Sequence, residues 1–147
     1  MAMLCAVIVT GAVVVGVVSA SAEGSRVSTG LTGEAEVPGP GDPDGRGRAV
    51  VSLNGRAVCF DLSFLKIGPP MAAHIHEGPP DVAGPIVVTF FMDEAGLPAE
   101  LRGVRGCVRH VDRDLVADIK ANPNDYYVNV HNAAFPAGAI RGQLRDN

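Results

Sequence analysis

Apolar and polar residues alternate along much of this chain, and the alternation predicts β-strands. The clearest run lies within residues 56–64, where every second residue is apolar: Val58, Phe60, Leu62 and Phe64. A period of two is typical of a strand with one buried face. This run faces residues 48–53 across Asn54-Gly55, a dipeptide typical of two-residue hairpin turns. The sequence therefore predicts a β-hairpin here.

Further short strands are expected along the rest of the chain, separated by loops rich in Gly and Pro. We expect them over residues 31–37, 71–77, 85–91, 104–108, 126–131 and 139–144. Residues 23–30 are small and polar, so we expect them to be flexible. A single helix is expected over 112–121, capped by Asp112 and ended by Asn122-Pro123. These elements predict one all-β domain over 31–147, an antiparallel Greek-key sandwich or partly open barrel with one short helix.

The first 22 residues predict an export signal. They contain no Lys, Arg, His, Asp or Glu, and Leu4 to Val18 is almost entirely apolar. The small residues that follow fit cleavage after Ala20 or Ala22. An uncleaved membrane anchor is the alternative, although the run falls short of the about 20 residues that a spanning helix needs. We expect a secreted or cell-envelope protein, in contact with a membrane only if the leader is retained.

Charge and cysteine content narrow the classes further. The chain has 12 basic and 16 acidic residues and a formal net charge of −4, which argues against nucleic-acid binding because that needs a basic surface. Beyond the leader only Cys59 and Cys107 remain. An even number of cysteines in an oxidising compartment predicts a disulfide between them. Two buried free thiols are the alternative.

The candidate chemistry lies in the histidines. His74 and His76 are two residues apart in an apparent strand, so both imidazoles project from one face. His131 lies in a second strand, on the side opposite the apolar Val128 and Val130. All three histidines are therefore expected on the outer surface of the sheet. If the two strands are neighbours, the imidazoles converge.

Three neutral imidazoles suit copper first, with zinc as the alternative, and do not suit Ca²⁺ or Mg²⁺, which prefer oxygen. Glu77, Asp61 or water could complete such a shell, and His110 is a further candidate ligand. A histidine pair can equally be ordinary strand surface, so a site without metal remains open.

Several motifs resemble the CHRD (chordin) domain family. They are residues 34–38, 73–78, 84–88, 115–122, 126–132 and 135–144, from the first, Glu34-Ala-Glu-Val-Pro38, to the last, which ends in Arg-Gly-Gln-Leu144. The resemblance covers about residues 29–145 and implies an immunoglobulin-like β domain of exported proteins without an established general activity. A fainter resemblance joins His74-Ile-His-Glu77 to the copper-ligand strand of Cu,Zn superoxide dismutases, another Greek-key β fold. This chain, with four His in all, cannot supply the full dinuclear ligand set of that family.

The leading functional hypothesis is an exported CHRD-domain protein that binds, stores or delivers a transition metal through His74, His76 and His131. A non-enzymatic adhesion or structural module without metal is the first alternative. A copper-dependent, dismutase-like enzyme is the second. An envelope or extracellular protein partner fits any of these, and the sequence leaves the oligomeric state open.

Overall fold

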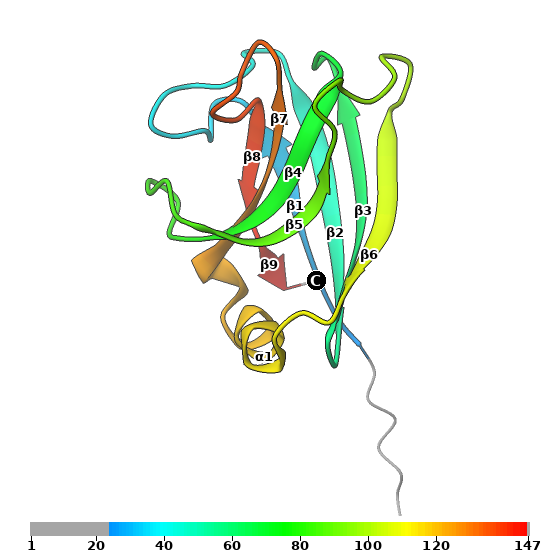
Figure 1. Ribbon diagram of the computed structural model, residues 1–147. Helices are drawn as coiled ribbons and strands as arrows, with labels where there is room; N and C mark the ends of the chain where they lie inside the picture. The colour runs from blue at the N-terminus through cyan, green and yellow to red at the C-terminus, as the bar shows by residue number, and fades with distance from the viewer. Residues whose placement is uncertain (1–23, 147) are drawn as a thin grey trace, which may run out of the picture.

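The computed structural model describes residues 24–146, and the leader expected over residues 1–22 lies outside them. Within these residues, nine strands and one α-helix follow each other (Figure 1). They are β1 (Ser25–Thr32), β2 (Arg46–Asn54), β3 (Ala57–Leu65), β4 (Pro70–Glu77), β5 (Ile86–Met92), β6 (Gly103–Arg109), α1 (Arg113–Ala121), a 3-10 turn η1 (Pro123–Asp125), β7 (Tyr126–Asn132), β8 (Ile140–Gln143) and β9 (Arg145–Asp146). In this part of the chain, no helix is both long and apolar enough to span a membrane.

The strands form one antiparallel sheet that curls into a nearly closed barrel. Its order is β5-β4-β7-β8-β1-β2-β3-β6, and β9 pairs with β1. The two edge strands, β5 and β6, approach each other without pairing and leave a seam at the right of Figure 1. The expected all-β fold is confirmed as a barrel with one open seam and one short helix.

The barrel interior holds the hydrophobic core. The predicted alternation of β3 is confirmed, because Val58, Phe60, Leu62 and Phe64 all lie inside and are at most 6% exposed. The helix α1 closes one end of the barrel (bottom of Figure 1) and buries Val116 and Ile119 against the core.

Two local predictions from the sequence are also confirmed. Asp112 caps α1 and accepts hydrogen bonds from the backbone N–H groups of Asp114 and Leu115, which satisfies donors that the first helical turn leaves free. The β2–β3 hairpin has the expected two-residue turn, shifted by one position, because Asn54 pairs with Ala57. Gly55 takes the first turn position with φ of 59°, a conformation that side chains disfavour.

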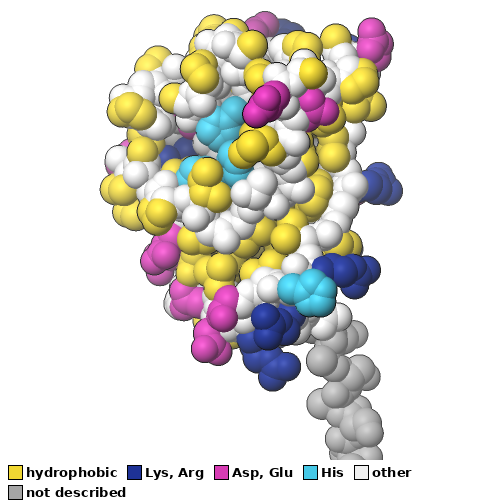
Figure 2. Space-filling view, in the orientation of Figure 1, with side chains coloured by type: hydrophobic (Ala, Val, Ile, Leu, Met, Phe, Trp, Pro, Cys, Tyr) yellow, Lys and Arg dark blue, Asp and Glu magenta, His cyan; other side chains and the backbone are white. Residues whose placement is uncertain are grey.

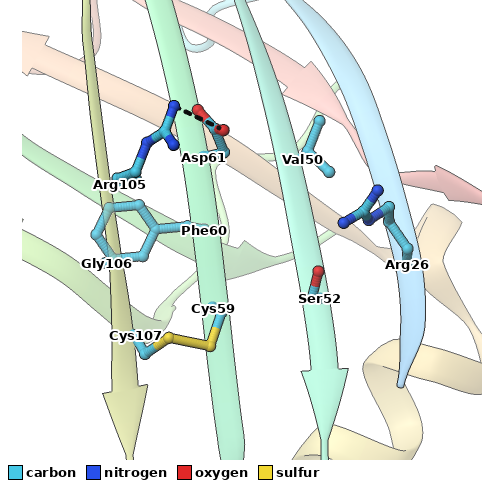
Figure 3. Close-up of a pocket in the computed structure, with 9 residues that line it drawn as sticks. All are labelled: Arg26, Val50, Ser52, Cys59, Phe60, Asp61, Arg105, Gly106 and Cys107. Atoms are coloured by element: carbon cyan, nitrogen blue, oxygen red, sulfur yellow. Dashed lines mark ion pairs between the residues drawn. A yellow bond between two sulfur atoms is a disulfide. The ribbon is translucent and has the colours of Figure 1, made fainter. Parts of the chain in front are cut away.

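Cys59 and Cys107 form the expected disulfide (Figure 3). They are direct partners on β3 and β6, on the outside of the barrel. The disulfide therefore fastens the edge strand β6 beside the seam. Asp61 lies on the same outer face and pairs with Arg105 at 3.4 Å, as Figure 3 shows.

The N-terminal part of the domain differs from the expectation. Residues 25–32 form a strand and not a flexible segment, whereas residues 33–37 form turns and not a strand. The cause is tertiary, because β1 lies between β2 and β8 and receives hydrogen bonds from both sides. Its Val27 and Leu31 reach the core, and the small residues between them fit a close approach of neighbouring strands.

A second buried layer covers the outer face of β4, β7 and β8. Residues 33–45, 78–85 and 133–139 fold back over this face. Nearly every residue of β4 and β7 is therefore buried on both sides of the sheet. Unlike the barrel interior, this layer is rich in polar residues, and its buried polar members are Glu36, His74, His76, Asn129, Asn132 and Arg141.

Candidate metal centre

The histidines of the two predicted strands come together because β4 and β7 are neighbours. In their antiparallel register, Ala72 lies opposite His131, His74 opposite Asn129, and His76 opposite Tyr127. Ile75 and Val128, which alternate with these residues, point into the barrel core and are fully buried. The prediction that all three imidazoles lie on the outer face of the sheet is therefore confirmed.

The expected exposure of that face is wrong. His74 is 4% exposed and His76 8%, while His131 is partly buried. The loops of the second layer cover them, and alternation within a strand cannot reveal such a cover. Figure 2 shows histidine side chains between hydrophobic ones, in a hollow on this side of the molecule.

The three imidazoles are close enough to share one ion. One nitrogen from each lies within 4.8 Å of the other two. His74 Nδ1 and His131 Nε2 are 3.2 Å apart. Two nitrogens bound to one zinc or copper ion at about 2.0–2.1 Å lie roughly 2.8–3.4 Å apart for angles between 90° and 110°. The arrangement could therefore hold a metal.

Backbone carbonyls fix the orientation of two of the rings. His76 Nδ1 lies 2.9 Å from the carbonyl oxygen of Gly84, and His131 Nδ1 lies 3.0 Å from that of Pro136. A carbonyl only accepts, so each Nδ1 carries the proton and donates. In the neutral rings, both Nε2 atoms then present a lone pair. A metal-binding histidine typically has its other nitrogen held in this way.

Burial keeps these rings neutral. Burial, followed by the proximity of His131 and His76, lowers the pKa of His74 to about 4. Burial also lowers the pKa of His76 and of His131, against the opposing effect of the carbonyls that accept their protons. Within residues 24–146, the Nε2 atoms of His74 and His76 are buried and have no hydrogen-bond partner. An unpaired buried lone pair costs free energy, and a cation bound between the rings would satisfy that of His76.

A stack of three side chains supports His76 from behind. The Tyr127 ring lies parallel to the imidazole at 4.7 Å, and the Arg141 guanidinium lies 3.4 Å from the centre of the Tyr127 ring on its other side. The guanidinium also donates to the carbonyls of Pro79 and Val82 at 2.9 and 3.0 Å. Arg141 therefore ties the covering loop 78–85 to the stack.

Gly84 connects the same loop to the histidines. Its carbonyl accepts the proton of His76, and its N–H donates to the Tyr127 hydroxyl at 3.1 Å. A Cβ at this position would lie 1.6 Å from the carbonyl oxygen of Glu77, so the chain can pass here only as glycine. The loop is thus a fixed part of the centre.

Glu36 is a buried acid at the edge of this polar layer. It is 6% exposed, and burial raises its pKa to about 7, against the opposing effects of Arg141 and the Asn129 side chain. Its Oε1 has no hydrogen-bond partner among the described residues. The folded protein therefore favours the protonated form of this carboxyl.

We expect Glu36→Gln to stabilise the metal-free protein progressively as the pH rises from about 4.5 to 7. Between these values the folded wild type binds more protons at Glu36 than the unfolded chain does, so its stability falls with pH through this window. Gln cannot ionise and lacks this loss. Urea unfolding at pH 5 and pH 8 measures the difference between variant and wild type. A difference that shrinks toward pH 8 would contradict the assignment.

The remaining candidate ligands lie outside the histidine group. His110 is exposed at the turn after β6, with φ of 63°, and its carbonyl accepts from Arg56. Glu77 is exposed at the end of β4, and Asp61 pairs with Arg105 on the outside of the barrel.

Sequence reasoning missed the polar residues that surround the histidines. Alternation places Asn129 and Tyr127 on the His131 face of β7, but it gives no sign that they contact the histidines. Arg141 and Glu36 come from β8 and from the loop after β1, and no pattern within those segments points to the histidines.

Comparisons with known proteins give one match. The family model described as CHRD domain matches residues 27–144, which include most of β1, all of β2 to β8 and every residue of the histidine group. No curated protein and no solved structure matches the chain, so the fainter likeness to Cu,Zn superoxide dismutases gains no support. The family match covers most of the chain. The chain, with its strands, its helix and the polar layer over β4 and β7, therefore belongs to the CHRD domain family.

Proposed function

We propose that this protein binds a transition metal, copper first, through His74, His76 and His131, for storage or delivery outside the cytoplasm. The observation that supports this most directly is the proton arrangement of the rings. His76 and His131 each commit Nδ1 to a backbone carbonyl, so that both Nε2 lone pairs remain for an ion in the space they share with His74.

The ligand type favours copper or zinc. Neutral imidazoles suit these borderline ions, whereas Ca²⁺ and Mg²⁺ require several oxygens. No carboxylate belongs to the histidine group. Because the pKa of His74 is about 4, protons compete little with a metal for this ring at neutral pH.

An extracytoplasmic location is part of the proposal. The Cys59–Cys107 disulfide is of a kind that persists in oxidising compartments, and residues 1–22 have the composition of an export signal. Copper in such a compartment would reach the protein without passing through the reducing cytosol.

Metal titration tests the proposed function. We expect the full chain, expressed for export and stripped of metal, to take up one copper ion per molecule. His74→Ala/His76→Ala should abolish stoichiometric binding. His110→Ala is the matched control, because this exposed histidine lies outside the group, and it should bind as the wild type does.

Thermal unfolding gives a second readout. A ligand that binds only the folded state, present at a concentration of one hundred times its Kd, adds about 2.7 kcal/mol to stability. Copper should therefore raise the Tm of the wild type and of His110→Ala, but not that of His74→Ala/His76→Ala. Equal binding by the wild type and the double variant would overturn the proposal. The remaining hypothesis would then be a disulfide-linked β module without metal, which acts through its surface.

A further inference from the structure

Asn129 extends the histidine group by an oxygen. It lies opposite His74 in the β4–β7 ladder and on the same face as His131. Its side chain is 2% exposed, so its amide has no access to bulk solvent. Its Oδ1 lies 3.0 Å from His131 Nε2.

This short contact joins two acceptors. His131 donates through Nδ1 to Pro136, so its Nε2 presents a lone pair, and an amide oxygen cannot donate. His74 Nδ1, at 3.2 Å from the same Nε2, can supply a proton to one acceptor and not to both. A cation between them would satisfy the amide oxygen and the ring nitrogens together.

The distance also fits two ligands of one ion. An oxygen at about 2.0–2.2 Å and a nitrogen at about 2.0–2.1 Å from the same metal are about 3 Å apart when the angle between them is near 90°. Amide oxygens occur as weak ligands beside imidazoles at copper sites.

From this geometry we infer that Asn129 Oδ1 is the fourth ligand and completes a closed three-histidine, one-amide shell. The inference rests on the proposed metal binding and goes beyond it, because closed sites hold a metal, whereas catalytic sites keep a position open for water or substrate. The inference therefore assigns to this centre the retention of a metal ion and not the catalysis of a reaction.

Azide binding to the copper(II)-loaded protein tests whether the shell is closed. Azide needs a free or exchangeable position and gives a charge-transfer absorption when it binds copper(II). We expect no such absorption in the wild type. Asn129→Ala should show it and should bind copper(II) roughly 10–100-fold more weakly.

Two further variants separate ligation from packing. Val130→Ala, a core-facing truncation on the same strand, should lose stability but keep the wild-type response to azide. Asn129→Asp keeps an oxygen at this place, so it should exclude azide and shift the electron paramagnetic resonance spectrum of copper(II). If Asn129→Ala does not fold, wild type and Asn129→Asp decide the matter.

The outcomes distinguish this inference from the proposed function. An azide absorption in the copper-loaded wild type would show an open position and overturn the role of Asn129, while metal binding stands. An Asn129→Asp spectrum identical to that of the wild type would also overturn it. Absence of stoichiometric copper in the wild type would overturn both.

Discussion

Arg141→Met is expected to lower the free energy of unfolding by roughly 3–5 kcal/mol, because it removes two hydrogen bonds donated by a buried charged group, each worth about 1.5–3 kcal/mol. Arg141 is 2% exposed and interacts with the buried Glu36. The substitution also leaves two carbonyls of loop 78–85, those of Pro79 and Val82, without their donors. Met fills similar space, so the loss reports the charge and the hydrogen bonds rather than a cavity.

The same variant should bind copper more weakly, because the loop that Arg141 holds supplies the carbonyl that orients His76. Urea unfolding of the metal-free protein and copper titration measure the two effects. Arg141→Lys is the control: it keeps the charge but not the two-pronged guanidinium, so an intermediate loss is expected. A loss below about 1 kcal/mol in Arg141→Met would contradict the role assigned to this side chain.

Cys59→Ser/Cys107→Ser is expected to lower stability by about 4 kcal/mol, the chain-entropy value for a loop of this length. The two cysteines are 48 residues apart in the sequence. Both lie on the outer face of the sheet, partly exposed or exposed, so the serines should create no cavity in the core.

Chemical denaturation of the double variant beside the wild type measures this loss. Copper affinity should stay unchanged, since the disulfide joins β3 and β6 while the histidines belong to β4 and β7. A variant as stable as the wild type would show that the disulfide does not restrict the unfolded chain. A variant that loses copper would show that the seam and the metal centre are coupled.

The sequence predicted those parts of the fold that local rules determine. The β2–β3 hairpin follows from a turn dipeptide and strict alternation, and α1 follows from its Asp112 cap and the Pro123 that ends it. These signals act within a few residues, so no knowledge of the rest of the fold is needed to interpret them.

Elements that depend on distant partners were missed. β1 consists largely of Ser, Thr and Gly, residues that suggest a flexible segment, and only pairing with β2 and β8 makes it a strand. In the same way, the covering of β4 and β7 depends on loops from three separate parts of the chain. A local pattern carries no information on either.

The same distinction between local rules and distant partners applies to the candidate site. Alternation was sufficient to place His74, His76 and His131 on one face, because each lies in a regular strand. His110 and Glu77 were weighed as ligands by residue type, and neither belongs to the histidine group. Glu36 and Arg141 reach the site from segments without any histidine, so only the three-dimensional arrangement reveals them.

Barrel closure makes the first and last segments of the domain partners: Thr32 lies opposite Arg141, and Val27 opposite Asp146. Pairings so distant in sequence form slowly, and until β8 arrives, β1 and β7 each present an unpaired edge that can associate with other chains. The residue that completes the barrel, Arg141, is also the one that holds the loop over the histidines. A nascent chain therefore cannot assemble its histidine group early, and a fully assembled group would mark a molecule in which β8 has already joined the sheet.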